Sequence, residues 1–136
     1  MKERFFRLLG DVNEQFPQVE VDLEVGEGSE FPNDRDYAYC EHNIDNTIKI
    51  VVAPGFEDLP ELNQEAILRH ELAHALEFAL GAKRAGYEFG PMLSRTSERR
   101  ADQIAEVFWQ EPILYDEKDL QTLDQGTYPR PERLGL

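Results

Sequence analysis

The sequence predicts a single α+β domain with an N-terminal helix, a small three-stranded sheet and two further helices. Three observations lead to this prediction. Apolar residues recur at helical spacing near the N-terminus, a following segment alternates strictly, and a long apolar helix pattern occupies the middle of the chain. With 136 residues and 40% hydrophobic content, the chain can bury one core. We place the domain at residues 1–112, followed by a tail at residues 113–136.

The first half is predicted to form one helix and three strands. Residues 2–16 have apolar side chains every three or four positions, and Pro17 ends that helix. Residues 19–25 alternate between apolar and acidic side chains, which indicates a half-buried strand. Residues 37–42 and 47–53 are two more strands, and the short turn between them predicts an antiparallel hairpin. The sheet is therefore mixed or antiparallel.

The second half is predicted to form two helices. Asp58 and the residues after it are typical of a helix start, so the central helix should run over residues 60–80 and stop at Gly81. Residues 82–95 contain two glycines and a proline, and we interpret them as a connection. A helix over residues 96–110 follows.

Two histidines four positions apart are the main functional signal. His70 and His74 lie on one face of the central helix, one turn apart, so both imidazoles can reach one point in space. Tetrahedral Zn²⁺ requires this geometry from two nitrogen ligands, and Glu71 lies beside the position that a water would take. Histidines at this spacing also occur on surfaces and in cores. The chain has only three histidines, however, and two of them flank a correctly placed glutamate.

The two remaining candidates for metal or nucleophile chemistry have simpler interpretations. His42, at the end of a predicted strand, is interpreted as an ordinary surface histidine near a turn. Cys40 is the only cysteine, which excludes an intrachain disulfide. No activating partner is implied beside it, so we interpret Cys40 as a small buried or edge residue.

A carboxylate pair on the last helix can complete the metal site. Glu98 and Asp102 are four positions apart and share a side with Ala101 and Ala105, whose small side chains allow close helix packing. A glutamate on a neighbouring helix can be the third ligand of a two-histidine zinc site. Asp102 would then accept a hydrogen bond from a ligand histidine and fix its tautomer. Taken alone, such a pair is more often a solvated acidic face.

The sequence His70-Glu71-x-x-His74 followed by Glu98-x-x-x-Asp102 resembles the gluzincin metallopeptidases, of which thermolysin is the familiar large member. The order of elements is similar too: helix, small sheet, motif helix and glutamate helix. In size the chain is most similar to the minigluzincins, single-domain microbial proteins reduced to this core. The resemblance covers roughly residues 1–110 and depends on five positions and the element order.

This resemblance implies a zincin-like fold in which His70, His74 and Glu98 bind Zn²⁺. It makes Glu71 the general base and proton shuttle, and Asp102 the partner of a zinc-bound histidine, His70 in the first place. Thermolysin also has a downstream domain that supplies a histidine to stabilise the oxyanion. No histidine follows His74 in this chain, which is a departure from the thermolysin pattern.

Two expectations concern residues outside the motif. Tyr87 is our first candidate for stabilising the oxyanion, followed by Tyr115 and Tyr128; a core or surface tyrosine is the alternative for each. Minigluzincins are similar to latent proteins whose C-terminal segment fills the cleft. The length of chain after Pro112 leads to a separate hypothesis, in which residues 113–136 bring Asp116, Glu117 or Asp119 to the zinc and displace its water.

Composition limits the partners and the compartment. Acidic residues outnumber basic ones by 28 to 14, and a net charge of −14 disfavours nucleic acid and anionic membranes. The N-terminus carries charges throughout and is unlike a signal peptide, and no apolar run is long enough to span a membrane. We therefore expect a cytoplasmic protein. The resemblance to the metallopeptidases implies a peptide or protein substrate.

Three functions remain open from the sequence. The leading hypothesis is a small zinc-dependent endopeptidase, in an active or a latent form. The alternative is a catalytically inactive zincin-fold module for binding or regulation that keeps a structural zinc. In the third, the domain binds no metal, and His70 and His74 face the core.

Overall fold

The computed structural model describes residues 1–31, 37–89 and 97–111, apart from the side chains of residues 82, 83, 86, 87 and 97. These ranges form an α+β fold, as the sequence predicts. Two short 3₁₀ turns, Gly28–Glu30 and Phe56–Asp58, join some of its elements. The main elements are α1 (Lys2–Gln15), β1 (Val21–Val25), β2 (Ala38–His42), β3 (Ile48–Val52), α2 (Glu61–Leu80), α3 (Ala82–Phe89) and α4 (Ser97–Trp109).

The sheet is mixed, with the strand order β1-β3-β2. β1 runs parallel to β3, with Val21 opposite Ile48. β2 runs antiparallel to β3, with Ala38 opposite Val52, which confirms the predicted hairpin. The central strand β3 is therefore paired on both sides, and β2 lies at an edge of this three-stranded sheet.

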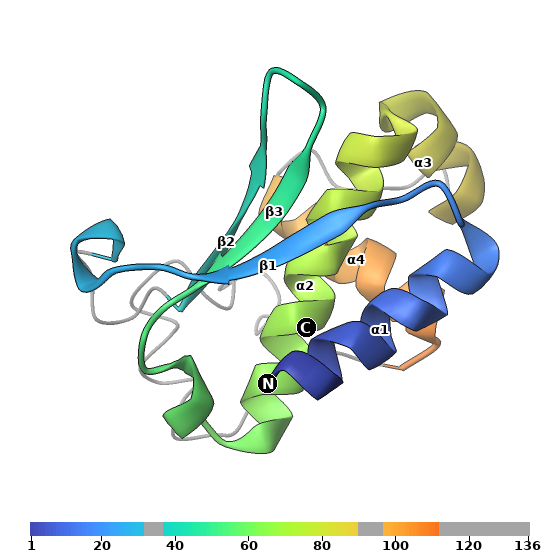
Figure 1. Cartoon of the computed structure of the whole chain (residues 1–136). Coiled ribbons are helices and arrows are strands. Elements are labelled where there is room, and N and C mark those ends of the chain that lie inside the picture. The colour runs from blue at the N-terminus through green and yellow to red at the C-terminus, as the bar shows by residue number, and fades with distance from the viewer. Residues whose placement is uncertain (32–36, 90–96, 112–136) are drawn as a thin grey trace.

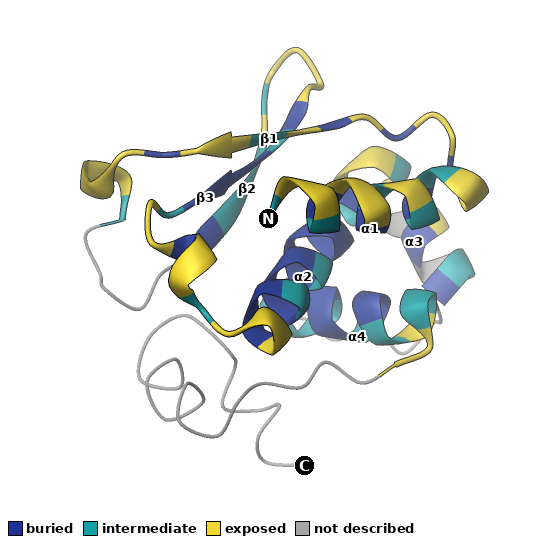
Figure 2. Cartoon of the chain, turned by 60° about the horizontal axis from the view of Figure 1, so that its bottom comes forward, coloured by how far each residue is buried: buried dark blue, intermediate teal, exposed yellow. Residues whose placement is uncertain are grey.

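Helix α2 is the centre of the fold. It contacts α1, α3, α4 and the two hairpin strands, and Figure 1 shows it crossing the middle of the molecule. Every residue from His70 to Leu76 is buried, and Figure 2 shows the dark blue of buried residues along this helix. A helix that is buried all round belongs to the core. Polar side chains in its middle are therefore held away from bulk water.

Gly81 ends α2 as predicted. Its backbone adopts φ +83°, a conformation that glycine tolerates without steric cost, and its N–H donates to the carbonyl oxygen of Glu77 at 2.9 Å. α2 begins within one residue of the predicted start, but its cap is not the predicted Asp58. Pro60 is the N-cap residue and Asp58 ends the preceding 3₁₀ turn, while the side chain of Gln64 donates to the carbonyl oxygens before the helix.

The prediction of a plain connection after Gly81 was wrong, because residues 82–89 form the helix α3. Ala85 and Phe89 are four positions apart and both are buried, so one face of α3 packs on the core. Glycine costs about 1 kcal/mol inside a helix relative to alanine. Packing of this apolar face outweighs that penalty. The rest of the predicted connection, residues 90–95, lies outside the described residues.

Within the described ranges, none of the helices has both the length and the apolar character that crossing a bilayer requires.

Candidate metal centre

The two histidines of α2 point to one place. The side chains of His70 and His74 are buried, with relative exposures of 1% and 8%. Their rings are nearly perpendicular, with centroids 4.8 Å apart, and the two Nε2 atoms are 3.1 Å apart. The helical spacing thus brings the two nitrogen atoms together, as the sequence predicts.

Helix α4 brings a carboxylate to the same place. Glu98 Oε2 lies 3.0 Å from His70 Nε2, and Glu98 Oε1 lies 3.1 Å from His74 Nε2. The carboxylate therefore spans both rings. The side chain of Glu98 is 36% exposed, so solvent reaches this carboxylate. Among the described residues, His70, His74 and Glu98 form a group of ligand atoms close enough to hold a metal ion.

Asp102 lies one helical turn after Glu98 and contacts the far side of the first histidine. Its Oδ1 atom is 2.7 Å from His70 Nδ1, and its side chain is 4% exposed. A carboxylate at this distance accepts the Nδ1 proton, which fixes the orientation of the ring. In neutral His70, the lone pair of Nε2 then faces Glu98 and His74. We call His70, His74, Glu98 and Asp102 the metal cluster.

The electrostatics of the metal cluster demand positive charge between the rings and the carboxylate. Burial alone would lower the pKa of His70, but hydrogen bonds with Asp102 and Glu98 outweigh burial and raise this pKa to about 10. Burial would likewise raise the pKa of Glu98, but hydrogen bonds with His70 and His74 hold it well below its usual range. A proton or a metal cation can supply this positive charge.

The shape of the cluster favours a metal cation over a proton. Each Nε2 atom lies 3.0–3.1 Å from one Glu98 oxygen, the two Nε2 atoms are 3.1 Å apart, and a single proton bridges only two such atoms at a time. Ligands of a tetrahedral zinc ion, at bond lengths of about 2.0–2.1 Å, lie about 3.3 Å from one another. The spacing in the cluster is close to this value. Two imidazoles and one carboxylate also form a donor set that suits zinc.

Glu71 is the third acidic residue whose charge acts on His70, after Asp102 and Glu98. It is buried, at 2% exposure, and it directly follows His70 in α2. Its negative charge raises the pKa of His70 and also that of the Cys40 thiol on β2, which places the carboxylate near both. Burial is the larger cause of the raised thiol pKa, so Cys40 stays protonated and is a poor nucleophile. A buried acidic residue is therefore within electrostatic range of His70 and of Cys40 on β2.

Phe78 and His42 border the site, and the sequence analysis assigned neither a place there. The Phe78 ring stacks on His74 with centroids 6.2 Å apart and on His42 with centroids 5.0 Å apart. His42 is exposed at the end of β2, as expected of a surface histidine. Phe78 is four positions after His74 and eight after His70, so its helical spacing could have indicated that it shares their face.

The remaining predicted site residues lie outside the described structure. Tyr87 falls in α3, but its side chain is not among the described ones. Tyr115, Tyr128 and the acidic residues of the tail, residues 113–136, also lie outside the described ranges. The proposals for an oxyanion donor and for a latent form therefore stay predictions.

Comparisons with protein-family models, with curated proteins and with solved structures found no match to this chain.

Proposed function

We propose that this chain is a zinc-dependent peptide-bond hydrolase with a zincin-like fold. One observation carries the proposal: two imidazole nitrogens and one carboxylate converge at 3.0–3.1 Å from two different helices, with a buried glutamate next to the first histidine. The resemblance of the motif to the gluzincins supports the same reaction. The order of elements around α2 supports it as well.

In this proposal His70, His74 and Glu98 hold the ion, and Asp102 orients His70 through Nδ1. A bound zinc ion polarises a carbonyl and lowers the pKa of a coordinated water to about 7. The Glu71 carboxylate accepts a proton from the attacking water and gives it to the leaving amine. Its position beside His70 suits this transfer.

The sheet topology supports one strand as the place where substrate binds. An extended peptide can add to the edge of a sheet through main-chain hydrogen bonds. Of the two hairpin strands that the sequence left open, β3 is the central strand and β2 is the edge strand. β2 also contacts α2 and carries Cys40, which lies near Glu71. A peptide paired with β2 would therefore run close to the proposed base.

A zinc titration and a peptide-cleavage screen of one variant test the proposal. Glu71→Gln removes the proton acceptor but keeps the size of the side chain, so we expect one bound zinc per chain and no measurable hydrolysis. Glu61→Gln, at the exposed start of the same helix, is the matched control and should cleave like the unmodified protein. Equal hydrolysis by Glu71→Gln and the unmodified chain would overturn the assignment. Zinc binding without turnover in the unmodified chain would instead favour a structural zinc.

A further inference from the structure

A second polar contact joins α2 and α4 close to the metal cluster. Arg100 Nε donates to Glu77 Oε2 at 2.7 Å, and Arg100 Nη2 donates to Glu77 Oε1 at 3.0 Å. Two parallel bonds between a guanidinium and a carboxylate fix orientation as well as distance. The side chains are only 27% and 13% exposed, so water screens the pair less than an ordinary surface ion pair. We call Glu77 and Arg100 the fork pair.

The fork pair lies beside the ligands in both helices. Glu77 is three positions after His74 in α2, and Arg100 is two positions after Glu98 in α4. Successive residues are about 100° apart around an α-helix, so Glu98 and Arg100 project about 200° apart. They therefore reach α2 from different sides of α4. A roll of α4 about its axis that moves Glu98 off the imidazoles would also pull Arg100 away from Glu77.

Of the buried apolar residues of α4, Ile104 is large and Ala101 and Ala105 are small, and the small ones resist such a movement only weakly. Ala73 on α2 and Ala101 and Ala105 on α4 are buried, and their small side chains permit a close approach of the backbones. Methyl groups interlock less than large side chains, so they specify rotation and register weakly. Buried polar pairs are well suited to fix register. Glu98 also lies in the first turn of α4, where the backbone N–H groups have no acceptor inside the helix.

We infer that Glu77 and Arg100 are positioning residues that hold α4 at the rotation and register in which Glu98 reaches both histidines. This inference rests on the proposed function, because it assigns the fork pair a role in metal binding. The fork pair touches neither imidazole in this role; it acts through the placement of the Glu98 carboxylate. Without it, α4 can still pack on the core, but the third ligand is held less firmly.

Metal affinity of the full-length chain tests the inference, with Glu77→Gln as the principal variant. The neutral amide loses the charge-assisted fork, and we expect zinc affinity to fall about tenfold, as for loss of a group that orients a ligand. Arg100→Lys keeps the charge without the fork and should weaken zinc binding in the same direction. Glu65→Gln is the matched control. Glu65 is on the same helix as Glu77, and its carboxylate binds two arginines of α1 and one of α2 instead of a residue of α4. The zinc affinity of Glu65→Gln should change by less than about twofold.

The coordination geometry gives a second readout, one that a merely structural contact would not move. Co²⁺ in place of zinc should show a changed visible absorption spectrum in Glu77→Gln and an unchanged one in Glu65→Gln. Zinc affinity and Co²⁺ spectrum equal to those of the unmodified chain in both Glu77→Gln and Arg100→Lys would overturn the inference and leave the proposed function standing. A complete lack of zinc binding by the unmodified chain would overturn both.

Discussion

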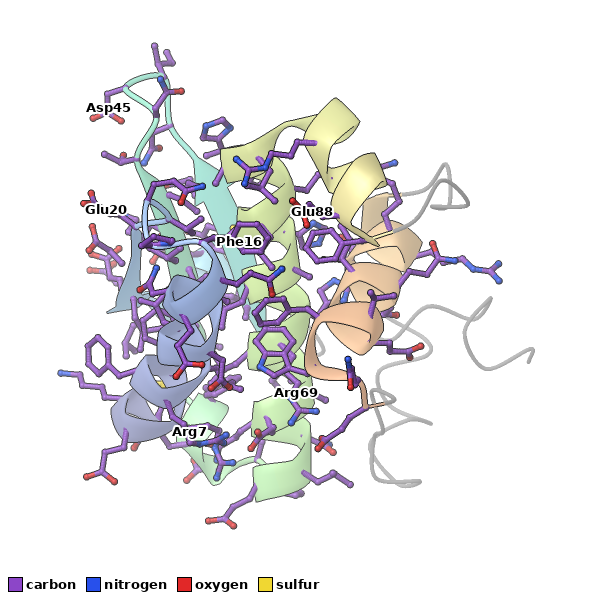
Figure 3. All side chains as sticks on the ribbon, turned by 90° about the vertical axis from the view of Figure 1, so that its right-hand side faces the viewer. Arg7, Phe16, Glu20, Asp45, Arg69 and Glu88 are labelled. Carbon is purple, nitrogen blue, oxygen red and sulfur yellow. The ribbon has the colours of Figure 1, made fainter. Side chains whose placement is uncertain are left out.

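Helix α2 carries two polar clusters that are built in opposite ways. Near its first turns, Glu65 accepts hydrogen bonds from Arg4, Arg7 and Arg69; these four residues are the arginine cluster. Arg7 and Arg69 lie at the same end of the molecule in Figure 3. One turn further along α2 the metal cluster begins. In the arginine cluster, every short contact joins an N–H donor to a carboxylate oxygen.

In the metal cluster, by contrast, the short contacts join imidazole nitrogens to each other and to carboxylate oxygens. The two Nε2 atoms are 3.1 Å apart, and the Glu98 oxygens lie 3.0 Å and 3.1 Å from them. When His70 is neutral and its Nδ1 donates to Asp102, its Nε2 is an acceptor that faces a carboxylate oxygen, which is also an acceptor. A cluster that only holds helices together pairs donors with acceptors. Two acceptors that face each other need a proton or a metal cation between them. This difference makes the metal cluster, rather than the arginine cluster, the candidate ligand site.

The largest expected effect comes from removing the ligand on α4. Glu98→Ala leaves two nitrogen ligands, and zinc affinity should fall by more than about 100-fold, since loss of a supporting group alone costs about 10–100-fold. Calorimetric titration measures this. Glu65→Ala, in the arginine cluster, should leave zinc affinity unchanged. If Glu98→Ala and Glu65→Ala bind zinc equally well, Glu98 is not a ligand and the proposed difference between the two clusters is wrong.

Lowering the pH should separate the two clusters next. His70, with its pKa raised to about 10, carries a proton that zinc must displace, so zinc affinity should fall about tenfold per pH unit below neutrality. Burial would raise the pKa of Glu65, but hydrogen bonds from Arg7 and Arg4 lower it overall. Because the pKa of Glu65 is lower in the folded protein, Glu65 stabilises the fold above its unfolded-state pKa. This contribution is lost only as the pH falls through the lower folded-state pKa. Chelator competition at several pH values measures the zinc affinity; a flat profile contradicts the prediction.

Asp102→Asn should have a smaller effect on zinc. The amide still fills the space but no longer offers a charged acceptor to His70 Nδ1, so the imidazole is a weaker base and is held less firmly. We expect zinc affinity to fall about 10–100-fold while one zinc still binds. Competition with a chromophoric chelator gives the constant. Affinity equal to that of the unmodified chain would show that Asp102 has no part in the site.

The smallest effect on zinc belongs to the arginine cluster, where a change should act on stability alone. Glu65→Gln weakens charge-assisted bonds to Arg4, Arg7 and Arg69, whose side chains are 21%, 54% and 13% exposed. We expect a loss of about 1–2 kcal/mol in the free energy of unfolding of the metal-free protein, because partial exposure screens these pairs. Urea unfolding measures it. If Glu65→Gln also lost zinc binding, the arginine cluster would have a role in the metal site, which contradicts the prediction.

Most of the fold follows from local sequence signals. The apolar periodicity of α1 and α2, the stop at Gly81 and the hairpin turn each depend on residues within one element, and the structure confirms them. The parallel pairing of β1 with β3 depends on contacts distant in the chain, so the sequence left the sheet mixed or antiparallel. The sequence did not predict α3, because the glycine at position 86 suggested a break. The burial of its apolar face depends on contacts with distant parts of the chain, which the local sequence does not show.

The candidate site also has a part that local sequence predicts and a part that it does not. The helical spacing of His70 and His74 and of Glu98 and Asp102 predicts which side chains share a face, and the structure brings all four together. The sequence contains no pattern that predicts the fork pair, because any of 14 basic residues could have paired with any of 28 acidic ones. Long-range pairing of that kind is decided by the packing of two helices and by nothing in either segment alone.

X-ray absorption at the zinc edge tests the central claim most directly, because it reports the atoms bound to the ion in the full-length chain. We predict one zinc per chain, bound by two imidazole nitrogens and by oxygen at about 2.0–2.1 Å. Failure to retain zinc would contradict the account. A sulfur neighbour at about 2.3 Å would also contradict it, because that distance would assign the ion to Cys40 in place of the histidine and glutamate cluster.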